Sequence, residues 1–172
     1  MTTVYHGSGQ KFSKFDYAKI GEHGTSEGQG FYFTSDKDIA HGYATESGSG
    51  YLYTVNFKGI KPMSDSKKTI KRTEFIRFVR ALGADFLENY GDLKTCIECE
   101  FDTAESDTEI ISGMINGYGN REKVLTLLHE ILGFDSVVQD SPEWGIGQIV
   151  YVAMVESAYE ILSVEKIEAK NG

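Results

Sequence analysis

Two tyrosines near the start of the chain are spaced so that they could hold a flat ring between them. Tyr32 lies in a short aromatic run at 30–34, and Tyr43 follows it by eleven residues. The serine and charged residues after this run predict a helix that begins near Asp36, which would place Tyr43 about two turns into the helix. Aromatic faces stack at a low cost in entropy, so the pair could bind a planar ligand. The alternative is that these rings only fill the core.

Polar residues at the end of the first expected strand favour a binding site. Residues 3–7 form a short β-branched and aromatic run, and His6, Gly7 and Ser8 stand at its end. A strand-end histidine with satisfied hydrogen bonds would explain His6 alone. Together with the spaced tyrosines, the His-Gly-Ser sequence indicates a site for a ligand.

The order of these pieces resembles the ADP-ribosyltransferase superfamily, in the branch named for a His-Tyr-Glu triad that diphtheria-type toxins and poly-ADP-ribose polymerases share. The sequence at 5–8 matches the His-Gly element of the family, and the sequence at 30–33 matches its Gly-x-Tyr-Phe element. Tyr43 has the spacing of the second nicotinamide-stacking tyrosine. Phage and mobile-element members of this branch share the aromatic strand and the apolar-x-x-Tyr-Ala helix. The resemblance covers the first third of the chain well and the last quarter loosely.

This resemblance implies that NAD is the substrate, and no feature of the sequence requires a metal. Gly7 would present its backbone to the nicotinamide amide, which requires a residue without a side chain. His6 would bond the adenosine ribose, and Tyr32 and Tyr43 would sandwich the nicotinamide. The N-glycosidic bond would break through an oxocarbenium-like transition state. The residues predicted to bind NAD are His6, Gly7, Ser8, Tyr32, Phe33 and Tyr43.

The third triad position departs from the family. The family places a glutamate at the start of a buried strand near the C-terminus, and here that position is Gln148. An amide can hold a ribose hydroxyl, but it can neither act as a base nor offset a cation as a carboxylate does. Members without the glutamate are generally mono-transferases, and some are inactive. Glu143 and Glu156 are the nearest carboxylates and remain alternatives, so the predicted catalytic residues are His6, Tyr32 and Gln148.

A second departure concerns Ala40. Polymerase members have a serine at this position, which also binds the nicotinamide amide, whereas this chain has alanine. The substitution argues against polymer synthesis.

The elements that would position these residues form an α+β domain. The patterns predict strands at 3–7, 31–34, 51–57, 134–138, 147–154 and 159–167, and helices at 36–45, 73–87, 108–115 and 121–132. Pro62 is expected to end the strand at 51–57, and residues 139–145 are expected to form a turn. The resemblance implies a split β-sheet core of two facing sheets, with a helical insert at about 62–132 in one domain of residues 1–172. The loop at 16–29 is long enough to be a functional lid or a disordered segment.

Composition indicates an ordinary globular protein with a modest bias toward acidic residues. The chain of 172 residues is 40% hydrophobic and 25% charged and has a net charge of −9. It contains neither an apolar run long enough to cross a bilayer nor a signal peptide, so we expect a cytoplasmic protein without a membrane partner. Eight lysines and arginines nevertheless cluster at 58–80, where phosphates of RNA or DNA could dock, or where they could simply be solvated.

The two cysteines are predicted to be structural. Cys96 and Cys99 form a lone CxxC within residues 95–101, which could be a strand or the end of a helical insert. A strand would point them to opposite faces, which is poor geometry for a metal, so both are expected to be small buried apolar residues.

These expectations together describe a mono-ADP-ribosyltransferase that acts on RNA, DNA or protein. The resemblance suggests a toxin or a phage-defence effector, with an antitoxin or another inhibitor protein as a possible partner. A non-catalytic NAD or ADP-ribose binding module and an NAD glycohydrolase are the alternatives, since Gln148 replaces the family glutamate. A structural domain with a purely aromatic core would not bind NAD at all.

Overall fold

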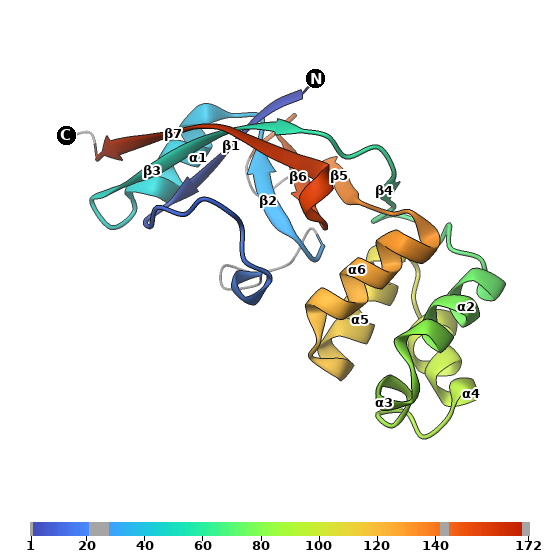
Figure 1. Ribbon diagram of the computed structural model, residues 1–172. Helices are drawn as coiled ribbons and strands as arrows, with labels where there is room; N and C mark the ends of the chain where they lie inside the picture. The colour runs from blue at the N-terminus through green and yellow to red at the C-terminus, as the bar shows by residue number, and fades with distance from the viewer. Residues whose placement is uncertain (1, 21–27, 142–144, 170–172) are drawn as a thin grey trace.

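Seven strands form one mixed sheet in the order β4-β5-β6-β2-β1-β3-β7 (Figure 1). The computed structural model describes residues 2–20, 28–141 and 145–169. The strands are β1 (Thr2–Ser8), β2 (Phe31–Thr34), β3 (Ser49–Phe57), β4 (Pro62–Met63), β5 (Ser136–Asp140), β6 (Ile149–Ala153) and β7 (Tyr159–Glu168). The helices are α1 (Lys37–Thr45), α2 (Arg72–Leu82), α3 (Ala84–Leu87), α4 (Leu93–Cys96), α5 (Asp107–Tyr118) and α6 (Arg121–Leu132), with a π-helix at Ile97–Asp102. The predicted α+β class is therefore confirmed.

The sheet consists of two halves that meet at a narrow seam between β1 and β2. The ladder between these strands contains a single residue pair, Tyr5 with Thr34. On either side of this seam the ladders are longer, with four pairs between β2 and β6 and seven between β1 and β3. The two sheets expected from the sequence are thus halves of one sheet, which is open along most of its central seam.

Helix α1 packs closely on the half of the sheet formed by β1 and β3. A Cβ atom added at Gly7 of β1 would lie 1.9 Å from the carbonyl oxygen of Ala40. At Gly50 of β3, the same addition would lie 1.9 Å from the carbonyl oxygen of Ala44. These two glycines therefore let the helix backbone approach the strands. The helix begins as expected, because the Asp36 side chain accepts hydrogen bonds from the backbone N–H groups of Asp38 and Ile39.

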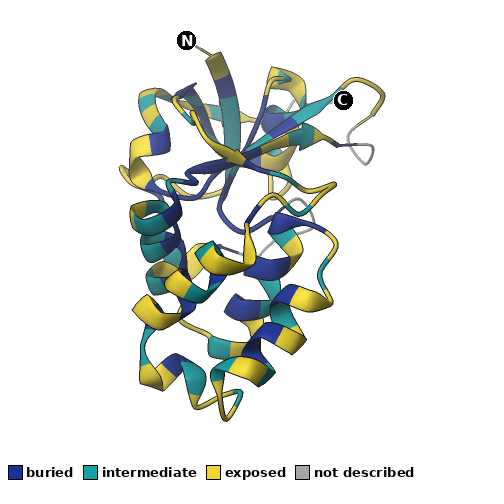
Figure 2. Cartoon of the chain, turned by 90° about the vertical axis from the view of Figure 1, so that its right-hand side faces the viewer, coloured by how far each residue is buried: buried dark blue, intermediate teal, exposed yellow. Residues whose placement is uncertain are grey.

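The remaining helices lie between β4 and β5 in the sequence and form a separate group in Figure 1. Strands β4 and β5 pair in parallel, Pro62 with Ser136, and parallel neighbours need a long crossover connection. Here the crossover is the whole helical segment. One cluster of buried side chains continues from the sheet into these helices, whose inward faces are buried in Figure 2.

Most expected elements are confirmed, with shifts at their ends. Strand β2 and helix α6 have the expected bounds, and Gly83, with φ of +94°, divides α2 from α3. Pro62 does not end the preceding strand but begins β4, because β3 already ends at Phe57. The strand expected at 134–138 begins two residues later, and it extends through Asp140 into the expected turn. Residues 142–144 of that turn lie outside the described part.

Residues 95–101 are helical, which resolves the alternative that the sequence left open and overturns the argument from strand geometry. Cys96 ends α4 and Cys99 lies in the π-helix. Only Cys96 is buried, whereas Cys99 is exposed, so the expectation of two buried cysteines is wrong for Cys99. Burial raises the pKa of the Cys96 thiol to about 12, and Glu100 and Cys99 add to the shift.

We predict that iodoacetamide at pH 8 labels the native protein at Cys99 and leaves Cys96 unmodified, since alkylation requires an accessible thiolate. Peptide mass spectrometry would measure the sites. Cys96 should become labelled in urea, and a Cys99→Ser variant should take up no label while folded. Labelling of native Cys96 at the rate of Cys99 would contradict the buried placement.

Among the described residues, no helix is both long and apolar enough to cross a bilayer.

Candidate active site

His6 lies at the open seam of the sheet and is hydrogen-bonded across it. Its Nδ1 atom is 2.9 Å from the backbone carbonyl oxygen of Tyr32 on β2. A carbonyl only accepts, so Nδ1 carries the proton, and in the neutral ring Nε2 then has the acceptor lone pair. This tautomer suits the predicted role of accepting a ribose hydroxyl. The ring also contacts four aromatic rings, of which Phe15 is closest at 4.8 Å between centroids.

Tyr32 points to the face of the sheet that α1 covers. The neighbouring rings of Phe31 and Phe33 both contact Phe15, on the opposite face. Side chains alternate along a strand, so Tyr32 between them faces the other way. Gly7 faces α1 by the same alternation, since its neighbour His6 also contacts Phe15.

The Tyr32 hydroxyl donates a hydrogen bond of 2.6 Å to the carbonyl of Gly28, at the end of the loop that enters β2. The tyrosine ring is therefore held from both ends, by its strand and by this loop.

Tyr43 belongs to α1 and is 51% exposed, which is unusual for a large aromatic side chain. Its helix covers the face that Tyr32 and Gly7 share, as the predicted nicotinamide slot requires. The structure thus brings Gly7, Tyr32 and Tyr43 to one side of the sheet, whereas the His6 ring lies on the opposite side, against Phe15.

Gln148 directly precedes β6 and lies beside the start of α1. Its Nε2 atom donates a 3.2 Å hydrogen bond to Oδ2 of Asp36, the N-cap of α1. The pairing of Thr34 with Val150 on β2 and β6 brings the two residues together from 112 positions apart. The sequence analysis had used Asp36 only as a helix start, and no local pattern pointed to this contact.

Two other predicted residues have clear structural surroundings. The Phe33 side chain is 1% exposed and packs in the core against His6, Phe15 and Phe57, so any contact of Phe33 with NAD would be through its backbone. Ser8 ends β1 and accepts a 3.1 Å hydrogen bond from the backbone N–H of Gln10.

Of the two glutamates that are alternatives to Gln148 at the third triad position, only Glu156 lies within the described residues. Glu156 follows the far end of β6 and forms an ion pair with Lys14. Since β6 occupies Ile149–Ala153, Gln148 and Glu156 lie at opposite ends of that strand. Glu143 lies outside the described residues.

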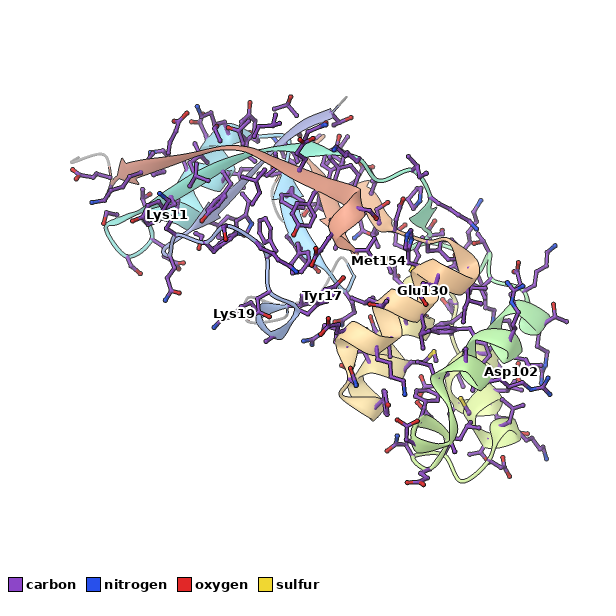
Figure 3. The ribbon with its side chains drawn as sticks, in the orientation of Figure 1. Lys11, Tyr17, Lys19, Asp102, Glu130 and Met154 are labelled. Carbon is purple, nitrogen blue, oxygen red and sulfur yellow. The ribbon has the colours of Figure 1, made fainter. Side chains whose placement is uncertain are left out.

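The described ends of the expected lid at 16–29 are hydrogen-bonded to two different parts of the protein, α6 and the end of β6, and residues 21–27 lie outside the described part. Arg121 Nε donates a 3.0 Å hydrogen bond to the side-chain oxygen of Gln29. At the other end, Tyr17 donates a 3.2 Å hydrogen bond to the Met154 carbonyl, and Figure 3 shows both residues labelled. Burial raises the pKa of Tyr17 to about 12, with the Glu156 and Glu122 carboxylates adding to the shift.

The basic stretch at 58–80 is mostly engaged within the protein. Lys61 and Lys68 donate to backbone carbonyls of Leu132 and of Phe101 and Ala104, and Arg77 donates to that of Ile131. Two further members form ion pairs, Lys58 with Glu160 and Arg72 with Asp102. Five of the eight cations thus have internal partners, so this stretch gives little support for a continuous phosphate-binding surface.

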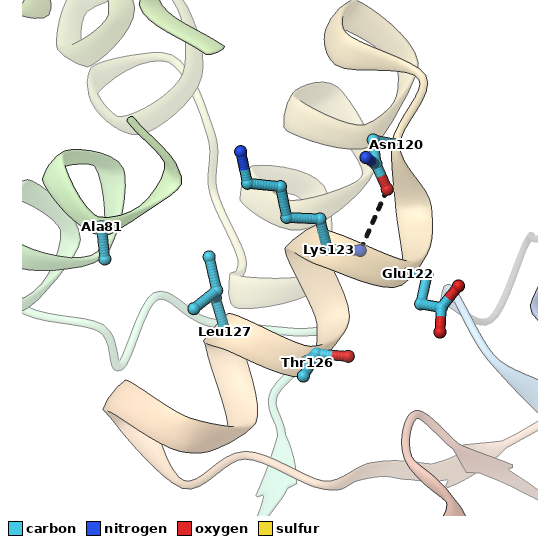
Figure 4. A pocket seen from close by; sticks show the side chains of 6 residues that line it. All are labelled: Ala81, Asn120, Glu122, Lys123, Thr126 and Leu127. Atoms are coloured by element: carbon cyan, nitrogen blue, oxygen red, sulfur yellow. Dashed lines mark hydrogen bonds between the residues drawn. The ribbon is translucent and has the colours of Figure 1, made fainter. Parts of the chain in front are cut away.

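A hollow of about 610 Å³ lies away from the predicted site (Figure 4). Ala81 of α2 lines it together with residues of and around the first half of α6, namely Asn120, Glu122, Lys123, Thr126 and Leu127. None of the predicted site residues is among them. Within the described ranges, no three histidine, cysteine or acidic side chains gather as metal ligands would.

A family model described as "ADP-Ribosyltransferase in polyvalent proteins" matches residues 1–143. The chain belongs to this ADP-ribosyltransferase family. No curated protein and no solved structure matches it. The matched residues include His6, Gly7, Tyr32 and Tyr43, while Gln148 lies beyond them.

Members of this family transfer ADP-ribose and use NAD as the substrate. The resemblance read from three short motifs in the sequence is confirmed by a match that extends over the helical insert as well.

We expect replacement of Tyr43 by alanine to weaken NAD binding by about tenfold or more, since stacking on one aromatic ring contributes about 1–3 kcal/mol. Because the Tyr43 side chain is half-exposed, we expect the variant to fold. Isothermal titration calorimetry would measure the affinity. Tyr43→Phe retains the ring and should bind within about twofold of the unmodified ADP-ribosyltransferase. Equal binding by all three proteins would exclude Tyr43 from the NAD site.

Proposed function

We propose that this chain is a mono-ADP-ribosyltransferase that moves ADP-ribose from NAD to a macromolecular acceptor. The observation that carries the proposal is the grouping around α1. Gly7 and Tyr32 face this helix, Tyr43 belongs to it, and Gln148 is bonded to its N-cap. In the family that the sequence resembles, residues at the matching positions bind nicotinamide and its ribose.

The proposed reaction breaks the bond between C1′ of the ribose and the nicotinamide nitrogen. Both bonding electrons leave with nicotinamide, which becomes neutral, and the ribose becomes an oxocarbenium ion. A nucleophilic atom of the acceptor then bonds to C1′ and loses its proton to solvent. Tyr32 and Tyr43 would hold the leaving ring on the α1 side of the sheet, and His6, whose ring lies on the other side, would hold the adenosine ribose across the open seam.

Two residues support single transfer rather than polymer synthesis. Gln148 replaces the glutamate of the triad, and Ala40 replaces the serine found in polymerase members. We further propose that the protein acts as a toxin or phage-defence effector whose activity an inhibitor protein restrains, a role that rests on resemblance to phage and mobile-element members.

The test is incubation with NAD labelled on the adenylate phosphate, together with a whole-cell lysate. Free nicotinamide is measured, and labelled products are separated on a gel with and without protease and nuclease. A labelled band is the expected result, and its sensitivity to protease or nuclease identifies the acceptor class. Nicotinamide release without a band would replace this proposal by NAD glycohydrolase activity. NAD binding without nicotinamide release would indicate the non-catalytic binding module that Gln148 also allows.

A further inference from the structure

The contact between Gln148 and Asp36 places a carboxylate directly behind the amide that replaces the family glutamate. Gln148 donates from Nε2 to Oδ2 of Asp36 over 3.2 Å. A carboxylate only accepts hydrogen bonds, so the amide atom that faces it is the nitrogen. The planar amide then directs its oxygen, Oε1, away from Asp36. The contact thus determines which end of the amide is available to a ligand.

Asp36 is itself held firmly. Its second carboxylate oxygen accepts hydrogen bonds of 2.8 and 3.3 Å from the backbone N–H groups of Asp38 and Ile39. Its own N–H donates to the Thr34 hydroxyl over 3.0 Å. These three contacts fix the carboxylate between the end of β2 and the start of α1, the two elements that carry Tyr32 and Tyr43.

A hydrogen bond from the amide nitrogen to an anion also changes the amide oxygen. The negative charge of Asp36 draws the N–H toward it and favours the resonance form with more negative charge on Oε1. Hydrogen bonds in series polarise one another in this way, and charge-assisted ones are the strongest. Oε1 therefore becomes a better acceptor for a hydroxyl group and a better neighbour for a developing cation.

We propose that Asp36 is a positioning residue, and that Asp36 and Gln148 together replace the missing glutamate. Gln148 Oε1 accepts the hydrogen bond of a hydroxyl on the nicotinamide ribose, while Asp36 orients and polarises the amide from behind. This inference rests on the proposed transfer reaction. It adds that the carboxylate of the site comes from the turn between β2 and α1, whereas the family glutamate stands at the start of the strand that corresponds to β6. No bond to Asp36 forms or breaks, and the acceptor proton still leaves to solvent.

The experiment compares nicotinamide release and NAD affinity in matched variants of the full chain. Asp36→Ser removes the carboxylate and retains a good helix cap, because serine and aspartate are similar at this position. Asp38→Ser is the control, since Asp38 is an exposed carboxylate two residues away and the Gln148 amide donates to Asp36. We expect Asp36→Ser to lower kcat by about tenfold or more, as loss of outer partners of catalytic groups does elsewhere. Its KM for NAD and melting temperature should change little, and Asp38→Ser should match the unmodified protein.

A reversed pair separates positioning from a merely structural role. In the double variant Asp36→Asn with Gln148→Glu, the asparagine amide donates to the glutamate and the pair keeps one negative charge. We expect this variant to recover most of the activity that Asp36→Ser loses. Unchanged kcat in Asp36→Ser would overturn the inference, and so would a loss of activity explained by a lower melting temperature with no recovery in the reversed pair. If the unmodified protein releases no nicotinamide, the proposed function itself fails first.

Discussion

Replacing Gln148 with alanine should lower the rate of nicotinamide release by about 100- to 1,000-fold, the usual cost of removing one group that stabilises charge in a transition state. Gln148 is only half-buried at the start of β6, so the variant should fold. The stacking residues remain, and NAD affinity should fall much less than kcat. Initial rates of nicotinamide formation at saturating NAD, with calorimetric binding of NAD, would measure both effects.

Two glutamate variants are the controls, because either residue is an alternative third member of the triad. Glu156→Gln removes a carboxylate whose ion pair with Lys14 lies at the other end of β6, and it should leave kcat unchanged. Glu143→Gln should do the same. If one of these variants lost activity while Gln148→Ala retained it, the catalytic position would move to that glutamate.

Replacing Gly7 with alanine should destabilise the fold by about 3 kcal/mol or more, at the upper end of the cost of overpacking a core. The added Cβ would lie 1.9 Å from the carbonyl oxygen of Ala40 and 2.7 Å from the backbone nitrogen of Ala44. Both are backbone atoms of α1, so relief requires a shift of the whole helix that carries Tyr43. The midpoint of urea unfolding should therefore fall, together with NAD binding.

Gly42→Ala is the matched control within the same helix. No atom lies within 4 Å of a Cβ added there, and alanine is favoured over glycine in a helix by up to about 1 kcal/mol. This variant should be slightly more stable than the unmodified protein. Equal stability of Gly7→Ala and Gly42→Ala would show that α1 is not packed closely on β1.

The parts of the site that could be predicted are those with local signals. Phe31 to Thr34 has the β-branched and aromatic composition of a strand, and Asp36 caps the helix that follows, so the positions of Tyr32 and Tyr43 on their elements follow from neighbouring residues. These signals act over a few residues and need no knowledge of the tertiary structure.

The contact that completes the candidate site could not be predicted, because it joins residues 112 positions apart through a strand pairing. The secondary structure of residues 95–101 could not be predicted for another reason. Their apolar side chains fit the period of a strand as well as that of a helix. Only the folded protein shows that Cys96, Ile97 and Phe101 are buried together on the inner face of a helix. Gly7 was assigned to ligand approach alone, whereas the structure shows that helix packing requires glycine there as well.

The strand order also has a consequence during synthesis on the ribosome. Strand β2 has β6 as one neighbour and β3 has β7, so strands made early pair with strands made last. Contacts between such distant segments form slowly. A nascent chain that has not yet reached residue 148 cannot join Gln148 to Asp36, and β3 has an unpaired edge until β7 follows. The candidate site can therefore be completed only after Gln148 and the strand β6 that follows it have been translated.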